Sequence, residues 1–241
     1  CFWRNTRAAL PRIRQRLMFL PEQRHKRIIR TIKHGYEIPF TEYPPPFHRA
    51  HNGPDLVEHR DQAWAALPKD IAHGAVRPCN IKDHGKPRVV SPVRTVPKGW
   101  RSGKRRFVIN MRFINQFIPD SESSCELDTT LSRIRGMFQA HGTPHNQVWG
   151  FTMDLVSGYH NFRINDNQLE LMGIAVHVAE LRDHAISWLR SNPAAIGCED
   201  KASGLFYFTV VALPFGLGPS CVVFSDIVTA LAAVWRRHSV C

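Results

Sequence analysis

The sequence predicts an α+β protein, because strand-like and helix-like hydrophobic patterns occupy separate stretches of the chain. Residues 151–155 alternate apolar and polar side chains with the period of a half-buried strand, whereas 20–35 and 218–237 place apolar residues at helical spacing. Of the 241 residues, 43% are hydrophobic and 22% are charged, which is near the average for globular proteins. This material suffices for one large domain or two small ones with a substantial core.

The charge balance is strongly basic. The chain has 32 lysines and arginines against 20 acidic residues, a net charge of +12 and an isoelectric point near 9.9. An excess of this size favours a polyanionic partner, with nucleic acid ahead of a membrane surface. The alternative is a basic protein whose charge serves only its solubility.

Cysteine and histidine spacing does not favour a disulfide framework or a zinc site. No C-x-x-C pair is present, so we expect reduced thiols and an intracellular protein, cytoplasmic or nuclear. Four histidines in Pro/Gly-rich stretches lack nearby cysteine or acidic ligands: His48, His51, His141 and His145. No stretch reaches the length of a membrane span. The chain begins and ends with Cys, without an initiating Met, and is expected to be part of a longer protein.

The first 83 residues predict helices joined by an extended arm. Residues 20–35 read as a helix with Pro21 near its start and Gly35 after its end. The following stretch, 35–54, is proline-rich and is expected to be extended. A short amphipathic helix over 55–67 and a further helical turn over 68–76 complete this part.

A basic β-hairpin is predicted next, since no acidic residue occurs from His84 to Pro119. Residues 88–98 read as one strand, 105–115 read as a returning strand, and the intervening turn carries cations. Such a hairpin suits a phosphate chain. The alternative is an edge hairpin kept soluble by its lysines and arginines.

The last third of the chain predicts two strands and two helices. A strand ends at Asp154, an amphipathic helix spans 178–193, and a buried strand over 204–217 leads into a helix that begins at Gly218. The apolar face predicted for that last helix consists of Phe224, Ile227, Val228, Leu231, Val234 and Trp235.

The carboxylate of Asp154 raises a question, because it ends an otherwise apolar strand just before a Ser-Gly turn and Tyr159. A buried carboxylate without a partner is costly. Asp154 is therefore either solvated or N-capping, or it attracts a positive partner.

The order of these motifs resembles the reverse transcriptases of retroelements, and most closely those of gypsy-like and tyrosine-recombinase (DIRS-like) retrotransposons. The resemblance covers about residues 35–237, and the 178–205 segment lengthens the spacing between its last two motifs. It rests on "GYEIPF", "VVSPVRTVPK" with "GKRRFVINMRFINQFIP", "FTMDLVSGYHNFRI" and "FTVVALPFGLGPSCVVFSDI".

This resemblance implies the fingers and part of the palm of a right-hand polymerase. It divides the chain into a basic helical connector (1–34), an extended arm with short helices leading into the fingers (35–83), fingers with the basic β-hairpin (84–148) and a partial palm (149–241). The implied partners are an RNA or DNA template-primer and deoxynucleoside triphosphates.

The resemblance also implies magnesium chemistry at Asp154. Polymerases of this kind use two Mg²⁺ ions for nucleotidyl transfer, and magnesium prefers carboxylate oxygens. Asp154 matches the first metal-binding aspartate of the family, and the backbone carbonyl of Leu155 matches the ligand beside it. The positive partner of Asp154 would then be a pair of ions.

Further residues match the nucleotide site of the family. Tyr159 lies where the family places an aromatic ring under the incoming sugar, which excludes a 2′-hydroxyl. Phe215 and Gly216 match the segment that packs against the nascent base pair. Cations of the hairpin match the finger residues on the triphosphate (Arg106 and, less surely, Lys98) and the expected nucleic-acid contacts (Lys104, Arg105 and Arg112).

One departure from the family affects the expected activity. The family needs an aromatic-x-Asp-Asp hairpin after the "LPFGL" helix, and the sequence stops at Cys241 directly after that helix. We therefore expect a fragment that is incomplete at its C-terminus, one that binds nucleic acid but does not polymerise alone. Two rivals stay open: a non-catalytic nucleic-acid-binding relic, and a metal-dependent phosphoesterase built on Asp154 and His160.

Overall fold

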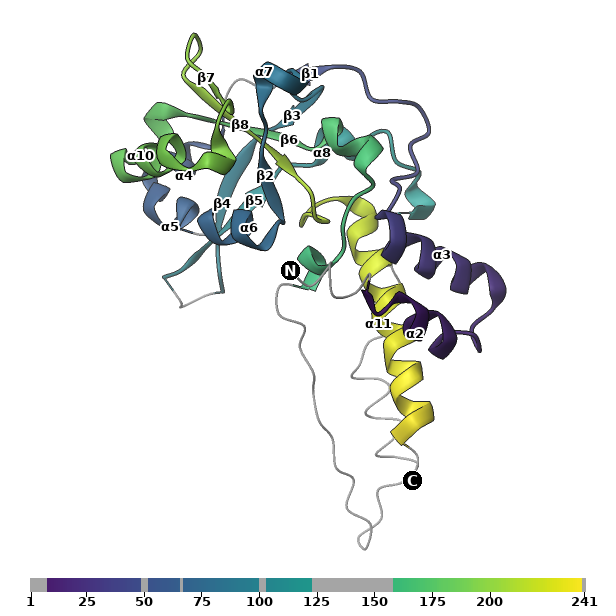
Figure 1. Cartoon of the computed structure of the whole chain (residues 1–241). Coiled ribbons are helices and arrows are strands. Elements are labelled where there is room, and N and C mark those ends of the chain that lie inside the picture. Colours follow the sequence, from purple (N-terminus) through teal and green to yellow (C-terminus); the bar gives the residue numbers. More distant parts are fainter. Residues whose placement is uncertain (1–7, 49–51, 66, 100–102, 123–157, 240–241) are drawn as a thin grey trace, which may run out of the picture.

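The fold combines a mixed sheet, a separate hairpin and packed helices, as the computed structural model in Figure 1 shows. The structure describes residues 8–48, 52–65, 67–99, 103–122 and 158–239. Helices and strands both contribute to these parts, as the sequence predicted. The boundaries proposed for connector, arm, fingers and palm remain predictions.

Six strands form the main sheet within the described ranges, in the order β1, β3, β6, β8 and β2, with β7 also paired to β8. Strands β1, β3 and β6 are parallel, and β8 runs antiparallel to β6 and to β2. Nearly every residue of β6 and β8 is buried, which explains their continuous apolar runs. The strands are β1 (Phe47–His48), β2 (Val76–Pro78), β3 (Val89–Ser91), β6 (Gly173–His177), β7 (Glu199–Asp200) and β8 (Leu205–Val210).

The basic hairpin exists, but its first strand is shorter than predicted. β4 (Val93–Pro97) pairs antiparallel with β5 (Arg105–Ile109), whereas the start of the single strand predicted over 88–98 lies in the main sheet as β3. Pro92 separates the two, because a proline has no N–H with which to continue a ladder. Its carbonyl instead accepts a hydrogen bond from the Asn110 N–H at 2.8 Å.

The helix predicted over 55–67 is divided. α4 (Pro54–Glu58) and α5 (Arg60–Trp64) are separated at His59. Pro68, which was expected to end the predicted helix, lies instead in the first turn of α6 (Leu67–His73). The division has a physical reason, since α4 contacts β4 while α5 contacts β5. With two short helices, each can lie along one strand of the hairpin, which one straight helix would not do.

Residues 52–64 cover one edge and one face of the hairpin. The Val93 N–H donates to the Asn52 side chain at 2.9 Å, and the Thr95 hydroxyl donates to the Asp55 carboxylate at 2.9 Å. Burial acts to raise the pKa of Asp55, but its hydrogen bonds from Thr95 hold that pKa below the ordinary value. Trp64 packs on Phe107 with ring centroids 5.1 Å apart. The other face of the hairpin therefore points outward.

The 178–205 segment contains the predicted helix in a shorter form. α10 spans Asp183–Ser191, and the turn η4 (Val178–Glu180) precedes it. The remaining short elements are α7 (Ile81–His84), α8 (Arg112–Asn115), η1 (Asp120–Glu122), η2 (Gly158–Asn161), η3 (Asp166–Leu171) and η5 (Pro193–Ala195).

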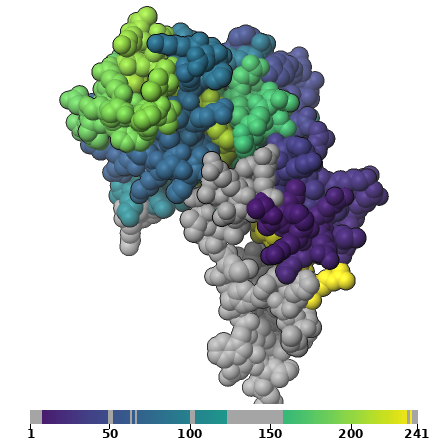
Figure 2. Space-filling model, viewed as in Figure 1, coloured from purple at the N-terminus to yellow at the C-terminus, as the bar shows by residue number. Residues whose placement is uncertain are grey.

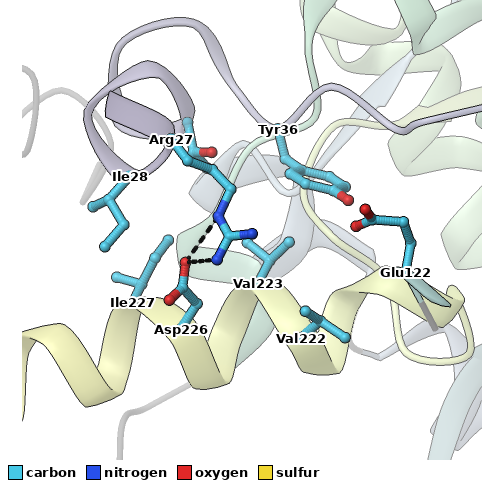
Figure 3. Close-up of a pocket in the computed structure, with 9 residues that line it drawn as sticks. Arg27, Ile28, Tyr36, Glu122, Val222, Val223, Asp226 and Ile227 are labelled. Carbon is cyan, nitrogen blue, oxygen red and sulfur yellow. Dashed lines mark hydrogen bonds and ion pairs between the residues drawn. The ribbon is translucent and has the colours of Figure 1, made fainter. Parts of the chain in front are cut away.

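Two arginines join the N-terminal region to the last helix. α2 (Leu10–Arg16) precedes α3 (Glu22–His34), and α3 lies beside α11 (Gly218–Ser239) in Figure 1. Arg24 Nε and Arg27 Nη2 each lie 2.7 Å from a carboxylate oxygen of Asp226, and Figure 3 shows the Arg27 pair. One α11 side chain thus binds two residues of α3.

A small cavity lies beside this ion-pair cluster. Its volume of about 20 Å³ suits about one water molecule. The Tyr36 hydroxyl points toward the Glu122 carboxylate at its rim (Figure 3). Burial and the neighbouring Glu122 raise the pKa of Tyr36, so this hydroxyl ionises less readily than that of an exposed tyrosine.

The buried face of α11 matches the predicted one in part, since Ile227 is buried and Phe224 and Val234 pack against the core as predicted. Val223, Ile227 and Ala230 are buried in the cluster that also contains Ile28 of α3. Leu231, assigned to the core from the sequence, is 46% exposed. The Asp226 ion pairs lie on this same side of α11, because residues 223, 226, 227 and 230 share one helix face, and that face meets α3. Among the parts of the chain that the structure describes, no helix is long and apolar enough to span a membrane.

Replacing Asp226 should detach α3 from α11. We expect Asp226→Asn to lower the free energy of unfolding by about 1–2 kcal/mol, since two arginines lose a shared charged acceptor that is mostly shielded from solvent. Urea unfolding measures this, and limited proteolysis should show earlier cleavage near α3. Glu42→Gln is the charge-matched control at an exposed site. Equal stability of the two variants would contradict a stabilising role for the cluster.

Candidate nucleic-acid interface

The two magnesium ligands proposed from the sequence, Asp154 and the Leu155 carbonyl, lie outside the described residues. Within the described ranges, no group of three or more His, Cys, Asp or Glu side chains could hold a metal ion. Their assignment as magnesium ligands therefore remains a prediction from the sequence.

Tyr159 and Phe215, predicted from separate motifs, contact one another. Their ring centroids lie 4.7 Å apart, and the Tyr159 ring also meets Phe224 of α11 edge-to-face at 5.1 Å. Gly158 permits this approach, because a Cβ at that position would lie 3.2 Å from the Phe224 ring. Phe215 is 47% exposed, so its ring offers an apolar surface to a ligand.

The turn that carries Phe215 is held by Asn115 of α8. The Asn115 side-chain NH₂ donates to the Gly216 carbonyl at 2.8 Å, and its Oδ1 accepts from the Gly218 N–H at 3.0 Å. The Ser220 hydroxyl donates to the Pro214 carbonyl at 2.9 Å. Gly216 has φ +93, a conformation that side chains with a Cβ rarely adopt. The sequence "LPFGLGPS" thus forms a fixed turn before α11.

Gly216 also lies against the base of the hairpin. A Cβ at Gly216 would stand 3.3 Å from the carbonyl oxygen of Ile109, the last residue of β5. Arg106 lies three residues earlier on β5, which places its backbone about 10 Å from this contact. Three of the predicted motif segments therefore meet here: the β5–α8 segment, the 158–161 turn and the "LPFGLGPS" turn.

The hairpin cations fall into two groups. Arg105 is folded back onto β4, where its Nε donates to the Thr95 hydroxyl at 2.8 Å. Arg106 is exposed and pairs with Val96, so it shares the outward face of the hairpin with the exposed Arg94. Arg106 is therefore the better placed of the two adjacent arginines to contact a ligand.

Further predicted cations lie on exposed backbone. The Lys98 N–H donates to the Lys104 carbonyl at 2.7 Å, which closes the hairpin near its turn. Both lysines are exposed, and so is Arg112 at the start of α8. Their contacts with nucleotide and nucleic acid remain predictions.

Two features of the site were not found from the sequence. Asn115 was not singled out, because nothing in the local sequence "RFIN" indicates which groups its side chain binds. Asp70 of α6 lies in the electrostatic field of His160, whose ring is 6.2 Å from that of Phe215. Burial raises the pKa of Asp70, and the charges of His160 and His73 offset part of this effect. A partly shielded carboxylate thus accompanies the 158–161 turn.

Comparison with known proteins supports the fold. No protein-family model matches the sequence, and no curated protein matches it. The chain is similar to the solved structure of the prototype foamy virus protease-reverse transcriptase, with a TM-score of 0.52 and 18% sequence identity. The match covers 83% of this chain and 21% of the viral one, so the chain spans about a fifth of that protein's length. At this identity the likeness concerns the fold alone.

The Asn115 side chain should be required for the turn between α8 and α11. We expect Asn115→Ala to lower the free energy of unfolding by about 2 kcal/mol, because two hydrogen bonds are lost and a backbone carbonyl and N–H lose their partners. Urea unfolding measures this against Gln116→Ala, a substitution of the exposed next residue. A cost no larger than that of Gln116→Ala would show that the turn is held by other contacts.

Proposed function

We propose that the chain is part of a retroelement reverse transcriptase, of gypsy-like or DIRS-like type, comprising the fingers and part of the palm. The observation that carries this proposal is the Tyr159–Phe215 contact beside the Asn115-held turn. It brings together three segments that the resemblance assigns to one nucleotide site. The similarity of fold to a viral protease-reverse transcriptase supports the same conclusion.

The proposed reaction is RNA-templated DNA synthesis by the whole protein, with DNA-templated synthesis as well. Asp154 and the Leu155 carbonyl would hold Mg²⁺, since carboxylate and carbonyl oxygens are the ligands that this ion prefers. Two such ions activate a primer 3′-hydroxyl and neutralise the leaving pyrophosphate when bound. One carboxylate does not hold two ions, so the remaining ligands come from outside the described residues.

In this proposal, described residues form the nucleotide side of the site. Tyr159 is braced by Phe215 and Phe224, and a braced ring can exclude a 2′-hydroxyl by its bulk. The exposed Phe215 and the tight Gly216 would face the nascent base pair. Arg106, with Lys98 as a second cation, would bind the triphosphate of the incoming deoxynucleotide.

The template-primer would lie along the basic surface of the hairpin. Arg94 joins Arg106 on its outward face, while Lys104 lies near the turn and Arg112 follows β5. Arg105 would act through the hairpin that it stabilises, or at the edge of the nucleic acid. Cations of this kind bind a phosphate chain regardless of sequence.

A non-catalytic nucleic-acid-binding relic is the second candidate. It is favoured by the exposed hairpin cations Arg94 and Arg106, which can bind a phosphate chain without any metal site. It shares the hairpin and its salt-dependent binding with the polymerase, and it differs only in having no magnesium-dependent activity.

Substitution of Asp154 tests the catalytic proposal. In the longer protein encoded by the open reading frame that contains this sequence, Asp154→Asn should reduce primer extension on an RNA template by about a hundredfold or more, the order that loss of one electrostatic stabiliser costs. Asp166→Asn, a change at an exposed aspartate of η3, is the matched control. Full activity of Asp154→Asn would remove the assignment, and an inactive unsubstituted protein would favour the relic.

Tyr159 should control the choice of sugar. We expect Tyr159→Ala to lower the preference for deoxynucleotides over ribonucleotides by about tenfold or more, since the space reserved against the 2′-hydroxyl opens. Tyr159→Phe keeps the ring and should retain the preference. Incorporation ratios in single-nucleotide extension measure both variants, and an unchanged ratio in Tyr159→Ala would end the sugar-exclusion role.

A further inference from the structure

The positive charge of α3 is largely used within the protein. Arg24 and Arg27 bind Asp226, and Arg30 binds Glu37. Lys26 pairs with Glu22 one helical turn away at 2.5 Å. These cations hold the N-terminal region together and leave little charge for a partner.

The arginines of α2 differ from those of α3. No acidic residue occurs in the first 21 residues of the chain. Arg12, Arg14 and Arg16 are exposed, and their guanidinium groups have no ion-pair partner among the residues that the structure describes. Arg237 of α11 extends this surface, because its guanidinium lies over the ring of Phe19, 5.3 Å from the ring centroid. We call Arg12, Arg14, Arg16 and Arg237 the α2 patch.

The spacing of these arginines is unfavourable for the helix itself. Arg12 and Arg16 are four residues apart, so like charges face one another on one side of α2, an arrangement that destabilises a helix. Arg14 and Arg16 lie in the last turn, where the helix dipole favours cations, but Arg12 lies outside it. The dipole therefore does not account for the whole set.

The apolar side of α2 packs against the rest of the protein. Leu17, directly after the helix, is 2% exposed, and Leu10 and Ile13 pack against the main core. The His25 ring nitrogen lies 3.2 Å from the Arg14 carbonyl, which also fixes α2 on α3. An interfacial membrane helix inserts its apolar face, whereas Leu10 and Ile13 of α2 are partly buried against the protein's own core. Among the residues described here, only Met18 and Phe19, just after the helix, are exposed large apolar residues. A phosphate chain needs only the exposed cations.

We propose that the α2 patch binds the phosphate backbone of nucleic acid as a second contact, separate from the hairpin. Figure 1 shows α2 over the lower part of α11, well apart from β4 and β5, and Figure 2 shows the dark purple N-terminal region at the surface. This inference rests on the proposal that the protein binds nucleic acid. It adds a phosphate contact on the exposed side of α2. The proposed nucleotide site does not require this contact.

The salt dependence of binding tests this proposal. The full chain is titrated with a mixed-sequence single-stranded DNA of about 40 nucleotides between about 50 and 300 mM salt, by fluorescence anisotropy. The triple variant Arg12→Gln, Arg14→Gln, Arg16→Gln should lower the slope of log K against log salt by about 2, and weaken binding about tenfold near 100 mM salt. Replacing the same three residues by Lys should retain the native slope.

A charge-matched control separates the patch from net charge. Lys26→Gln, Arg182→Gln, Arg190→Gln removes the same charge from residues already paired with Glu22, Asp61 and Glu199. This control should change the slope by less than half as much. A hairpin variant, Arg94→Gln with Arg106→Gln, reports on the first contact, and its effect should add to that of the α2 variant because the two sites share no contacts.

Four results would overturn the inference. If the native chain does not bind the DNA, the proposed function fails together with this inference. If it binds and the α2 variant binds equally, only this inference fails. An equal loss in the charge-matched control would reduce the patch to a net-charge effect. If the α2 variant lost binding to phosphatidylserine vesicles but kept DNA binding, the patch would be assigned to a membrane surface. Thermal unfolding checks that each variant is folded.

Discussion

The amide of Asn115 is the interaction on which the proposed site depends. It binds a carbonyl and an N–H of the same turn, Gly216 and Gly218, and so fixes the start of α11 relative to the segment that follows the hairpin. Phe215 then meets Tyr159, and the 158–161 turn is held against α11 through Phe224. A single side chain thus joins two parts of the chain that are 101 residues apart, at Asn115 and Gly216.

Much of this fold followed from periodicity and from Gly and Pro positions. The α3 helix ends at Gly35, the hairpin pairs as expected, and β8 leads through the glycine turn into α11. The errors have two kinds of cause. Pro92 divides the predicted strand between two sheets, a local effect of a residue that is visible in the sequence. The side of α11 that faces α3 depends on contacts between residues far apart, such as Arg24 and Asp226, which leave no mark on the local pattern.

The candidate site was predictable where a motif carried it. Tyr159, Phe215 and Gly216 come from quoted motifs and prove to be neighbours or parts of one turn. Asn115 was missed because its role arises only from partners distant in sequence. Charge counts were also too coarse, since they treated all cations alike. The structure distinguishes arginines that bind acids, such as Arg24, from those that face outward, such as Arg106 and Arg12.

The pairing of Arg24 with Asp226 joins residues 202 positions apart. During synthesis α3 leaves the ribosome long before α11, with Ile28 and Ile32 still without the surface that buries them. The apolar side chains of α3 are therefore not fully covered until α11 has been synthesised. For this protein, we expect the demand for chaperones and the yield on expression to depend on the delay between the synthesis of α3 and that of α11.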